Sequence, residues 1–239
     1  MKKISKKKLV LDIITVVVIA AITGAAVYMN DYYRSTDVES ALASSDEVKV
    51  QEIKEGYFFD GRGEDEALIF YPGGKVEFTA YAPMLKDLAE QGIDCFLVEM
   101  PANLAVFGQN KADHILEDYE YTHWYMAGHS LGGAMAASYT AEHLQDISGL
   151  VLLGAYATKD ISQGDFPVLV LYGSEDKIMN RGNFEKYRSN LPKDAIVLEL
   201  EGANHSNFGN YGHQEGDGKA AISAKEQQKL VIDNIINTF

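Results

Sequence analysis

A serine flanked by glycines follows a short apolar run and precedes a stretch of small residues. Residues 128–133 read Gly-His-Ser-Leu-Gly-Gly, which contains the G-x-S-x-G pattern of a serine on a tight turn between a strand and a helix. Glycines two residues to either side of Ser130 leave room for such a crowded turn. The free N–H groups at the start of the helix favour a developing anion. We therefore predict that Ser130 is a nucleophile; the alternative is a serine that caps the helix.

A serine hydroxyl needs a general base, and the chain offers six histidines. His205 directly follows the last apolar run, where open α/β sheets place their ligand sites, and histidine is the side chain that changes charge near neutral pH. We predict His205 as the base, with His213 as the alternative. His129 is adjacent to Ser130, and its side chain is expected to point away from the nucleophile. Structural roles are expected for the other three: His114, His123 and His143.

A carboxylate is needed to orient the histidine ring and to stabilise its protonated form. The apolar segment 166–171 is followed by Tyr-Gly-Ser-Glu-Asp, which places Asp176 just after a predicted strand. We predict Asp176 as the orienting acid, with Glu175 as its local competitor and a plain acidic turn as the alternative. The chain order serine, aspartate, histidine is the order expected for such a triad on an α/β sheet.

A third motif, Tyr-Pro-Gly-Gly-Lys at 71–75, follows another apolar run. Its glycines let backbone N–H groups approach a ligand oxygen. We predict an oxyanion hole that combines the N–H of Leu131 with that of Gly74 or Lys75, and each such donor typically contributes about 10²–10³ in rate. The alternative is a tight strand-to-helix turn. A phosphate-binding loop is excluded, because the chain lacks the G-x-x-x-x-G-K-[ST] pattern.

The elements that position these residues alternate between strands and helices. Continuous apolar strands separated by helices predict a doubly wound, mostly parallel α/β sheet. The predicted strands, after two short opening ones near 48–59, lie near 67–71, 93–98, 124–127, 150–153, 166–171 and 195–200. About a dozen residues separate the last two strands before Asp176. They are too few for a lid domain, so an open and shallow site is expected.

The motifs together resemble the α/β-hydrolase superfamily, in its small dienelactone-hydrolase-like and carboxylesterase-like group. The resemblance covers about 55–239 and rests on FYPGGKV, GHSLGG, LYGSED and EGANHSNFG, at 70–76, 128–133, 171–176 and 201–209. It implies Ser130 as nucleophile, Asp176 as acid and His205 as base of a serine esterase. Many relatives carry His-Gly where this chain has Tyr71-Pro72 or Pro72-Gly73, so the chain departs from the family at the expected oxyanion loop.

The amino-terminal region differs from the rest in charge and hydropathy. Residues 1–8 hold five lysines and no acid, and segment 9–29 carries a single charge, Asp12. Its 21 residues would form a helix of about 31 Å, close to the hydrocarbon thickness of about 30 Å. We predict a cytoplasmic basic tip at 1–8, a transmembrane signal anchor at 9–29, a polar juxtamembrane linker at 30–47 and a hydrolase domain at 48–239.

The lysines at the tip are expected to stay inside, which places the domain on the extracytoplasmic side of the cell membrane as a single-pass protein. The alternative is a cleaved signal peptide and a secreted domain, since Gly24-Ala25-Ala26 resembles a small-residue cleavage site.

The amino-acid composition limits the classes of partner that the protein could bind. The net charge of −14 argues against nucleic acid, and the single cysteine, Cys95, excludes an intramolecular disulfide and a thiolate zinc cluster. No metal or cofactor is indicated. The expected partners are a small-molecule ester and the lipid bilayer, the latter through segment 9–29. Two other functions stay open: acyl transfer to a cell-envelope acceptor, and a non-catalytic binding module on a hydrolase scaffold.

Overall fold

The computed structural model describes residues 5–239, which divide into two units. The first ends at Tyr32 and the second spans Tyr33–Phe239.

The first unit is one long helix, α1 (Lys6–Asn30). The side chain of Ser5 accepts a hydrogen bond from the N–H of Lys8 and so caps its start. The helix has a mean hydropathy of 2.5 over eighteen residues, and its side chains are exposed. It is long and apolar enough to cross a membrane, and it contains the predicted segment 9–29.

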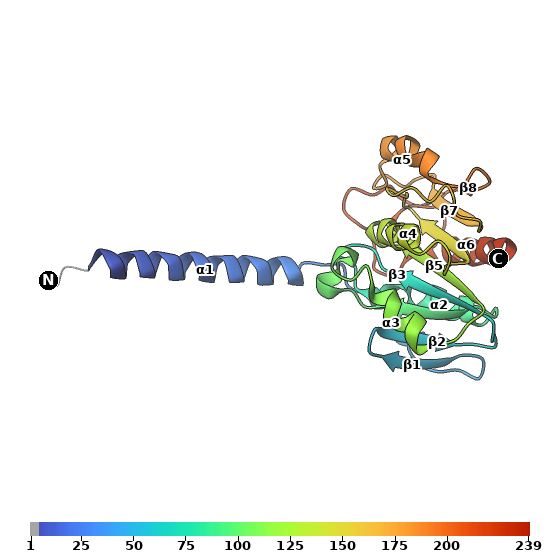
Figure 1. The fold of residues 1–239 in the computed structure, drawn as a ribbon, viewed down its shortest axis with the longest axis horizontal. Coiled ribbons are helices and arrows are strands. Elements are labelled where there is room, and N and C mark those ends of the chain that lie inside the picture. Colours follow the sequence, from blue (N-terminus) through green and yellow to red (C-terminus); the bar gives the residue numbers. More distant parts are fainter. Residues whose placement is uncertain (1–4) are drawn as a thin grey trace. The chain divides into compact units, whose positions relative to one another are not determined.

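The second unit is built on one eight-stranded sheet (Figure 1). The strand order is β1-β2-β4-β3-β5-β6-β7-β8; β2 runs antiparallel to both of its neighbours, and all other pairs are parallel. This order confirms the predicted doubly wound, mostly parallel sheet. The strands are β1 (Lys49–Ile53), β2 (Gly56–Asp60), β3 (Glu66–Tyr71), β4 (Asp94–Val98), β5 (His123–His129), β6 (Gly149–Leu153), β7 (Val168–Gly173) and β8 (Ile196–Leu200).

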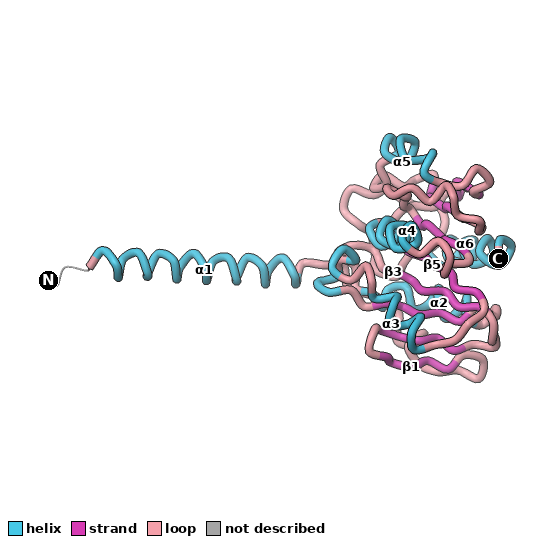
Figure 2. Tube along the Cα trace, in the orientation of Figure 1, coloured by secondary structure: helices cyan, strands magenta, loops and turns pink. Residues whose placement is uncertain are grey.

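Helices cover both faces of the sheet (Figures 1 and 2). Side chains alternate along each strand, so in β3 Leu68 and Phe70 pack in the core beneath α2 and α6, whereas Ile69 and Tyr71 pack in the core beneath α3, α4 and α5. These helices are α2 (Ala82–Ala89), α3 (Lys111–Asp118), α4 (Leu131–Glu142), α5 (Arg181–Tyr187) and α6 (Ala224–Thr238).

Short 3-10 turns lie in the loops between these elements. They are η1 (Phe78–Tyr81), η2 (Pro101–Asn103), η3 (Ala105–Phe107), η4 (Arg188–Asn190) and η5 (Ser206–Phe208). The described residues 154–167, between β6 and β7, form neither a helix nor a strand. In the described chain, no lid domain is therefore inserted between β6 and β7.

The segment before β1 packs against the sheet. Val38, Ala41 and Val48 are buried, and the Nζ of Lys86 in α2 donates hydrogen bonds to the carbonyls of Ser40 and Ala43. The compact unit begins at Tyr33, earlier than the predicted domain start at 48. The polar composition of this segment did not predict that it packs on the domain, because the packing uses backbone carbonyls and a few small apolar side chains.

Candidate active site

Ser130 lies on a strained turn between β5 and α4. Its backbone has φ 53° and ψ −120°, a region that residues other than glycine rarely adopt and that typically costs about 1–3 kcal/mol. The Ser130 N–H donates to the carbonyl of Leu153, 2.9 Å away. A Cβ on Gly128 would lie 2.6 Å from the carbonyl carbon of Gly132, and one on Gly132 would lie 2.2 Å from the oxygen of Tyr71. Both flanking glycines are therefore required by the close backbone approach at this turn.

His205 and Asp176 form a buried hydrogen-bonded pair. The Nδ1 of His205 lies 2.8 Å from the Oδ2 of Asp176, and the side chains are 1% and 0% exposed. Asp176 follows β7 and His205 follows β8, and these strands are parallel neighbours, so their carboxyl ends meet at one edge of the sheet. A carboxylate that accepts from Nδ1–H leaves Nε2 free to take a proton from another group.

The Asp176 carboxylate is held in place by its own turn. Its other oxygen, Oδ1, accepts hydrogen bonds from the N–H groups of Ile178 and Met179, each 2.9 Å away. These donors leave Oδ2 to face His205. The carboxylate thus has partners for both oxygens although it is buried, which offsets its desolvation.

The loop that carries His205 is fixed from two sides. The N–H of Asn204 donates to the Oε1 of Gln227 in α6 at 3.0 Å, and the carbonyl of Asn204 accepts from the Nε2 of Gln227 at 2.8 Å. The carboxylate of Asp217 accepts from the N–H of Ser206 at 2.8 Å, from that of His205 at 3.4 Å and from that of Lys177 at 3.3 Å. Asp217 therefore ties the histidine loop to the turn after Asp176. Several hydrogen bonds, with the Ser206 hydroxyl foremost, outweigh burial and lower the pKa of this carboxyl.

Two contacts bring the histidine loop to the turn of Ser130. A Cβ on Gly154, the residue after β6, would lie 2.9 Å from the His205 Nδ1 and 3.2 Å from the Asp176 Oδ2. The ring of His129, the residue before Ser130, lies 4.4 Å from the ring of His205 between centroids. The Nε2 of His205 is buried and has no hydrogen-bond partner among the residues that the structure describes. Ser130, Asp176 and His205 therefore share one edge of the sheet, with the Nε2 atom open to a new partner.

The loop after β3 supplies the second wall. A Cβ on Gly74 would lie 2.8 Å from the side chain of Leu131, so Gly74 lies against the start of α4. Leu131 is the first residue of that helix, where an N–H has no intrahelical acceptor. The N–H of Lys75 donates to the carbonyl of Asn103 at 2.8 Å, and that of Gly73 donates to the hydroxyl of Tyr81 at 3.1 Å. Of the predicted pair Gly74 and Lys75, only Gly74 keeps its N–H available to a ligand in this conformation.

His129 is a buried neighbour of the site that the sequence analysis did not assign to it. Its Nδ1 lies 2.8 Å from the hydroxyl of Tyr81, the same hydroxyl that accepts from Gly73. Burial, followed by repulsion from His205, holds the pKa of His129 well below its usual value of 6.5. The alternation of side chains along β5 could have indicated this position. Tyr125 and Ala127 face the core beneath α2 and α6, and every second residue shares that face, so His129 lies on it too.

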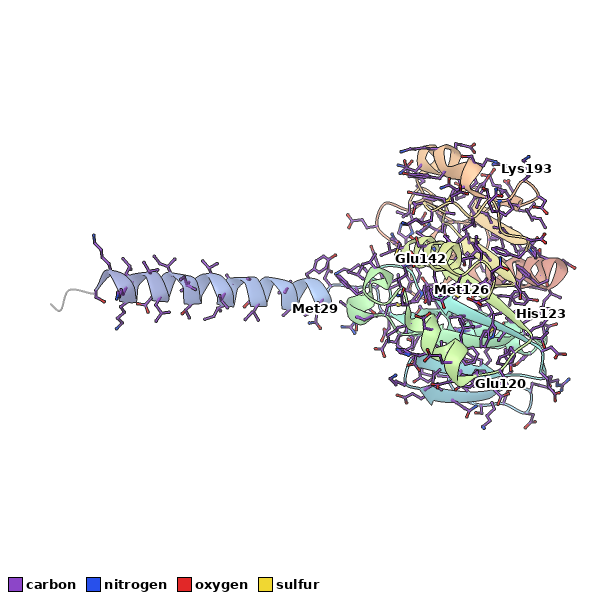
Figure 3. The ribbon with its side chains drawn as sticks, viewed as in Figure 1. Met29, Glu120, His123, Met126, Glu142 and Lys193 are labelled. Atoms are coloured by element: carbon purple, nitrogen blue, oxygen red, sulfur yellow. The ribbon has the colours of Figure 1, made fainter. Side chains whose placement is uncertain are left out.

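The other histidines lie outside this cluster. His123 begins β5, at the opposite end of the strand from Ser130, and Figure 3 labels it at that edge. His143 stacks on Tyr139, with ring centroids 4.1 Å apart. His114 and His213 are exposed. Within residues 5–239 no group of three histidine, cysteine or acidic side chains is arranged to hold a metal ion.

Comparisons with known proteins agree with this fold. The model of the alpha/beta hydrolase family matches residues 67–229, and the chain therefore belongs to that family. A search of curated proteins finds no match.

Solved structures share the fold at low sequence identity. Carboxyl esterase 2 of the fungus Tuber melanosporum has a TM-score of 0.60 at 11% identity, covering 87% of this chain and 91% of its own. Est1E of Butyrivibrio proteoclasticus has a TM-score of 0.57 at 13% identity, covering 80% and 98%. Mouse alpha/beta hydrolase domain-containing protein 10 has a TM-score of 0.59 at 13% identity, covering 81% and 98%. The protein is thus similar to hydrolases, two of which are named as esterases.

Proposed function

We propose that this protein is a serine hydrolase that cleaves carboxylic esters through an acyl-serine intermediate. The observation that carries the proposal is the buried pair of His205 and Asp176, 2.8 Å apart, at the edge where the strained turn presents Ser130. The esterase names of two structural neighbours agree with it. A binding module would have no need for a buried imidazole–carboxylate pair at the same edge of the sheet as a strained serine turn.

The first half of the reaction forms the acyl-enzyme. The Oγ of Ser130 attacks the ester carbonyl carbon while the Nε2 of His205 takes the hydroxyl proton. The carboxylate of Asp176 holds the ring by Nδ1 and stabilises its positive charge. The N–H groups of Leu131 and Gly74 donate to the oxyanion of the tetrahedral intermediate. The C–O bond to the alcohol then breaks, and the alcohol leaves with the proton from His205.

The second half releases the acid. Water gives a proton to His205 as its oxygen attacks the acyl carbon, and the bond to Ser130 breaks as the proton returns to its Oγ. An alcohol of the cell envelope in place of water would give acyl transfer by the same steps.

Anchoring by α1 completes the proposal. The apolar helix would hold the hydrolase at the cell membrane, and the lysines before it would keep the tip in the cytoplasm and the hydrolase outside. Extraction of membranes at alkaline pH tests the anchoring, and protease treatment of intact cells tests the sidedness. An anchored protein stays in the membrane pellet and loses its hydrolase domain to external protease; a cleaved and secreted one is found in the medium.

The decisive experiment is covalent labelling. The full-length protein in detergent is treated with a fluorophosphonate probe, beside Ser130→Ala and a matched control, Ser138→Ala, on the next turns of α4. We expect labelling and hydrolysis of p-nitrophenyl esters by the wild type and the control, and neither by Ser130→Ala. A folded wild-type protein that does neither contradicts the proposal. Products formed in water and in added alcohol then separate hydrolysis from acyl transfer.

A further inference from the structure

The chain joins the hydrolase domain at the edge of the sheet that carries Ser130. Tyr33 forms a short parallel bridge with Val76: its N–H donates to the carbonyl of Lys75, and its carbonyl accepts from the N–H of Glu77, both at 2.8 Å. The bridge therefore lies on the loop that contains Gly74. Tyr33 is therefore directly attached to one wall of the candidate active site.

Residues at and next to this bridge also contact the loop that follows His205, on another side of the site. The hydroxyl of Tyr33 accepts a hydrogen bond from the N–H of Glu215 at 3.1 Å, and the N–H of Thr36 donates to the carbonyl of Asn210 at 2.8 Å. Glu215 and Asn210 belong to the loop that follows His205. Segment 33–36 thus forms hydrogen bonds with both the loop that contains Gly74 and the loop that follows His205.

Very little chain separates this point from the apolar helix. α1 ends at Asn30, and only Asp31 and Tyr32 precede Tyr33. Three residues span at most about 11 Å when fully extended. If α1 lies in a bilayer, the wall of the site that holds Tyr33 cannot move far from the lipid headgroups. A free linker of the length predicted from sequence would have placed no such limit.

An exposed apolar turn lies beside the same wall. Val106 and Phe107 in η3 are 47% and 66% exposed. They follow Leu104, whose Cδ2 would lie 3.6 Å from a Cβ on Gly74, and Asn103, whose carbonyl accepts from the N–H of Lys75. An exposed phenylalanine next to a valine, at the rim of a site that a short chain joins to an apolar helix, has the chemistry of a side-chain pair that enters the lipid interface.

We infer that the site takes its ester from the membrane: the substrate is an ester-linked acyl chain of a lipid in the bilayer that holds α1, and the turn of Val106 and Phe107 enters that bilayer beside the site. This inference rests on the proposed function. It commits to lipid rather than to a protein partner because the short chain between Asn30 and Tyr33 keeps the bilayer within reach. The reaction is the one written above, with the lipid as the acyl donor and water as the acceptor.

The test compares two substrates on the full-length protein in phosphatidylcholine vesicles. One is diacylglycerol in the same vesicles, followed by release of fatty acid; the other is p-nitrophenyl acetate in solution. The variant Val106→Gln/Phe107→Gln is set beside Leu230→Gln/Ile236→Gln, two exposed apolar residues of α6 with 38% and 40% exposure. We expect the ratio of the lipid rate to the soluble rate to fall about tenfold in the first variant and to stay within twofold of the wild type in the second.

Each of the other results of this assay contradicts a specific part of the proposal. A wild type that cleaves p-nitrophenyl acetate but not the lipid overturns the substrate class and leaves the serine hydrolase intact. A ratio that changes equally in both variants, or in neither, overturns the role of Val106 and Phe107 at the membrane. A wild type that cleaves neither substrate and is not labelled at Ser130 overturns the proposed function itself, and this inference with it.

Discussion

Two buried histidines stand side by side at the end of the sheet, and their surroundings differ. His205 lies on the loop after β8 with a carboxylate, Asp176, at its Nδ1. His129 ends β5 with a phenol, that of Tyr81, at its Nδ1. Both rings are 1% exposed, and both Nε2 atoms lack a hydrogen-bond partner within the described residues. Burial alone therefore does not distinguish the two rings.

The difference lies in the charge of the partner. A carboxylate stabilises an imidazolium, so His205 can receive a proton during a reaction. A phenol carries no charge at neutral pH, and burial raises the pKa of Tyr81 further. His129 is held neutral by burial and by its neighbour His205. The partner of each ring therefore decides its charge: His205 can carry the second proton of an imidazolium, whereas His129 stays neutral beside it.

The largest expected effect is at the histidine with the carboxylate. In His205→Gln we expect kcat for a p-nitrophenyl ester to fall by about 10⁴ or more, because the glutamine amide cannot take the serine proton. His129→Gln, its matched control, should lose far less, about tenfold, because neutral His129 takes up no proton in the proposed reaction. Steady-state kinetics on both variants decide the comparison. Equal losses would mean that the two histidines have the same role.

The carboxylate itself comes next. Asp176→Asn keeps the shape but removes the charge, and the amide can present a donor to Nδ1, which selects the wrong tautomer. We expect kcat to fall by about 10³–10⁴ with a small change in KM. The loss should shrink at high pH, where hydroxide can act as the base in place of a His205 ring held in the wrong tautomer. Circular dichroism confirms folding, and an unchanged kcat in a folded variant would remove Asp176 from the mechanism.

A smaller effect is expected at the phenol. Tyr81→Phe removes the hydroxyl that accepts from Gly73 and contacts His129. We expect kcat to fall about tenfold with little change in KM, because the loop next to Gly74 loses one anchor while the other groups stay in place. Tyr139→Phe is the matched control and should retain its activity; the Tyr139 hydroxyl, in α4, donates to the carboxylate of Asp113 in α3. A loss in the control equal to that in Tyr81→Phe would indicate general loosening of the fold.

The smallest effect is a pH dependence of stability. The pKa of His129 is lowered in the folded protein, so the unfolded chain takes up this proton first as the pH falls. The stability that neutral His129 contributes is therefore present above pH 6.5 and is lost progressively below it, by at most about 1.4 kcal/mol per pH unit. Urea unfolding at pH 7 and pH 5.5 should show a shallower loss in His129→Gln than in the wild type. An identical loss would show that His129 does not titrate in this range.

Much of the sheet could be predicted from sequence because its strands are continuous apolar runs with helices between them. The turn of Ser130 could be anticipated for the same local reason, since the glycines at 128 and 132 only make sense where backbone segments nearly touch. The expected positions of Asp176 and His205 followed from the rule that parallel strands end at one edge. Their catalytic roles stay predictions that the variants above test.

Other features lay beyond the reach of the sequence. The docking of segment 33–48 uses backbone groups and a few small side chains, and its polar composition indicated a linker. The hydrogen bond from Lys75 to Asn103, which leaves Gly74 as the available donor, joins two loops whose distance no local pattern records.

The sequence by itself determined the alternation of elements, the tight serine turn and the apolar helix before the domain, because these depend on residue size, hydropathy and backbone freedom over a few positions. Only the tertiary structure decided that His129 packs on His205 and that Tyr33 is fixed beside Gly74. Such contacts join segments far apart in the chain, and their free energy depends on packing and desolvation that exist only once the sheet has formed.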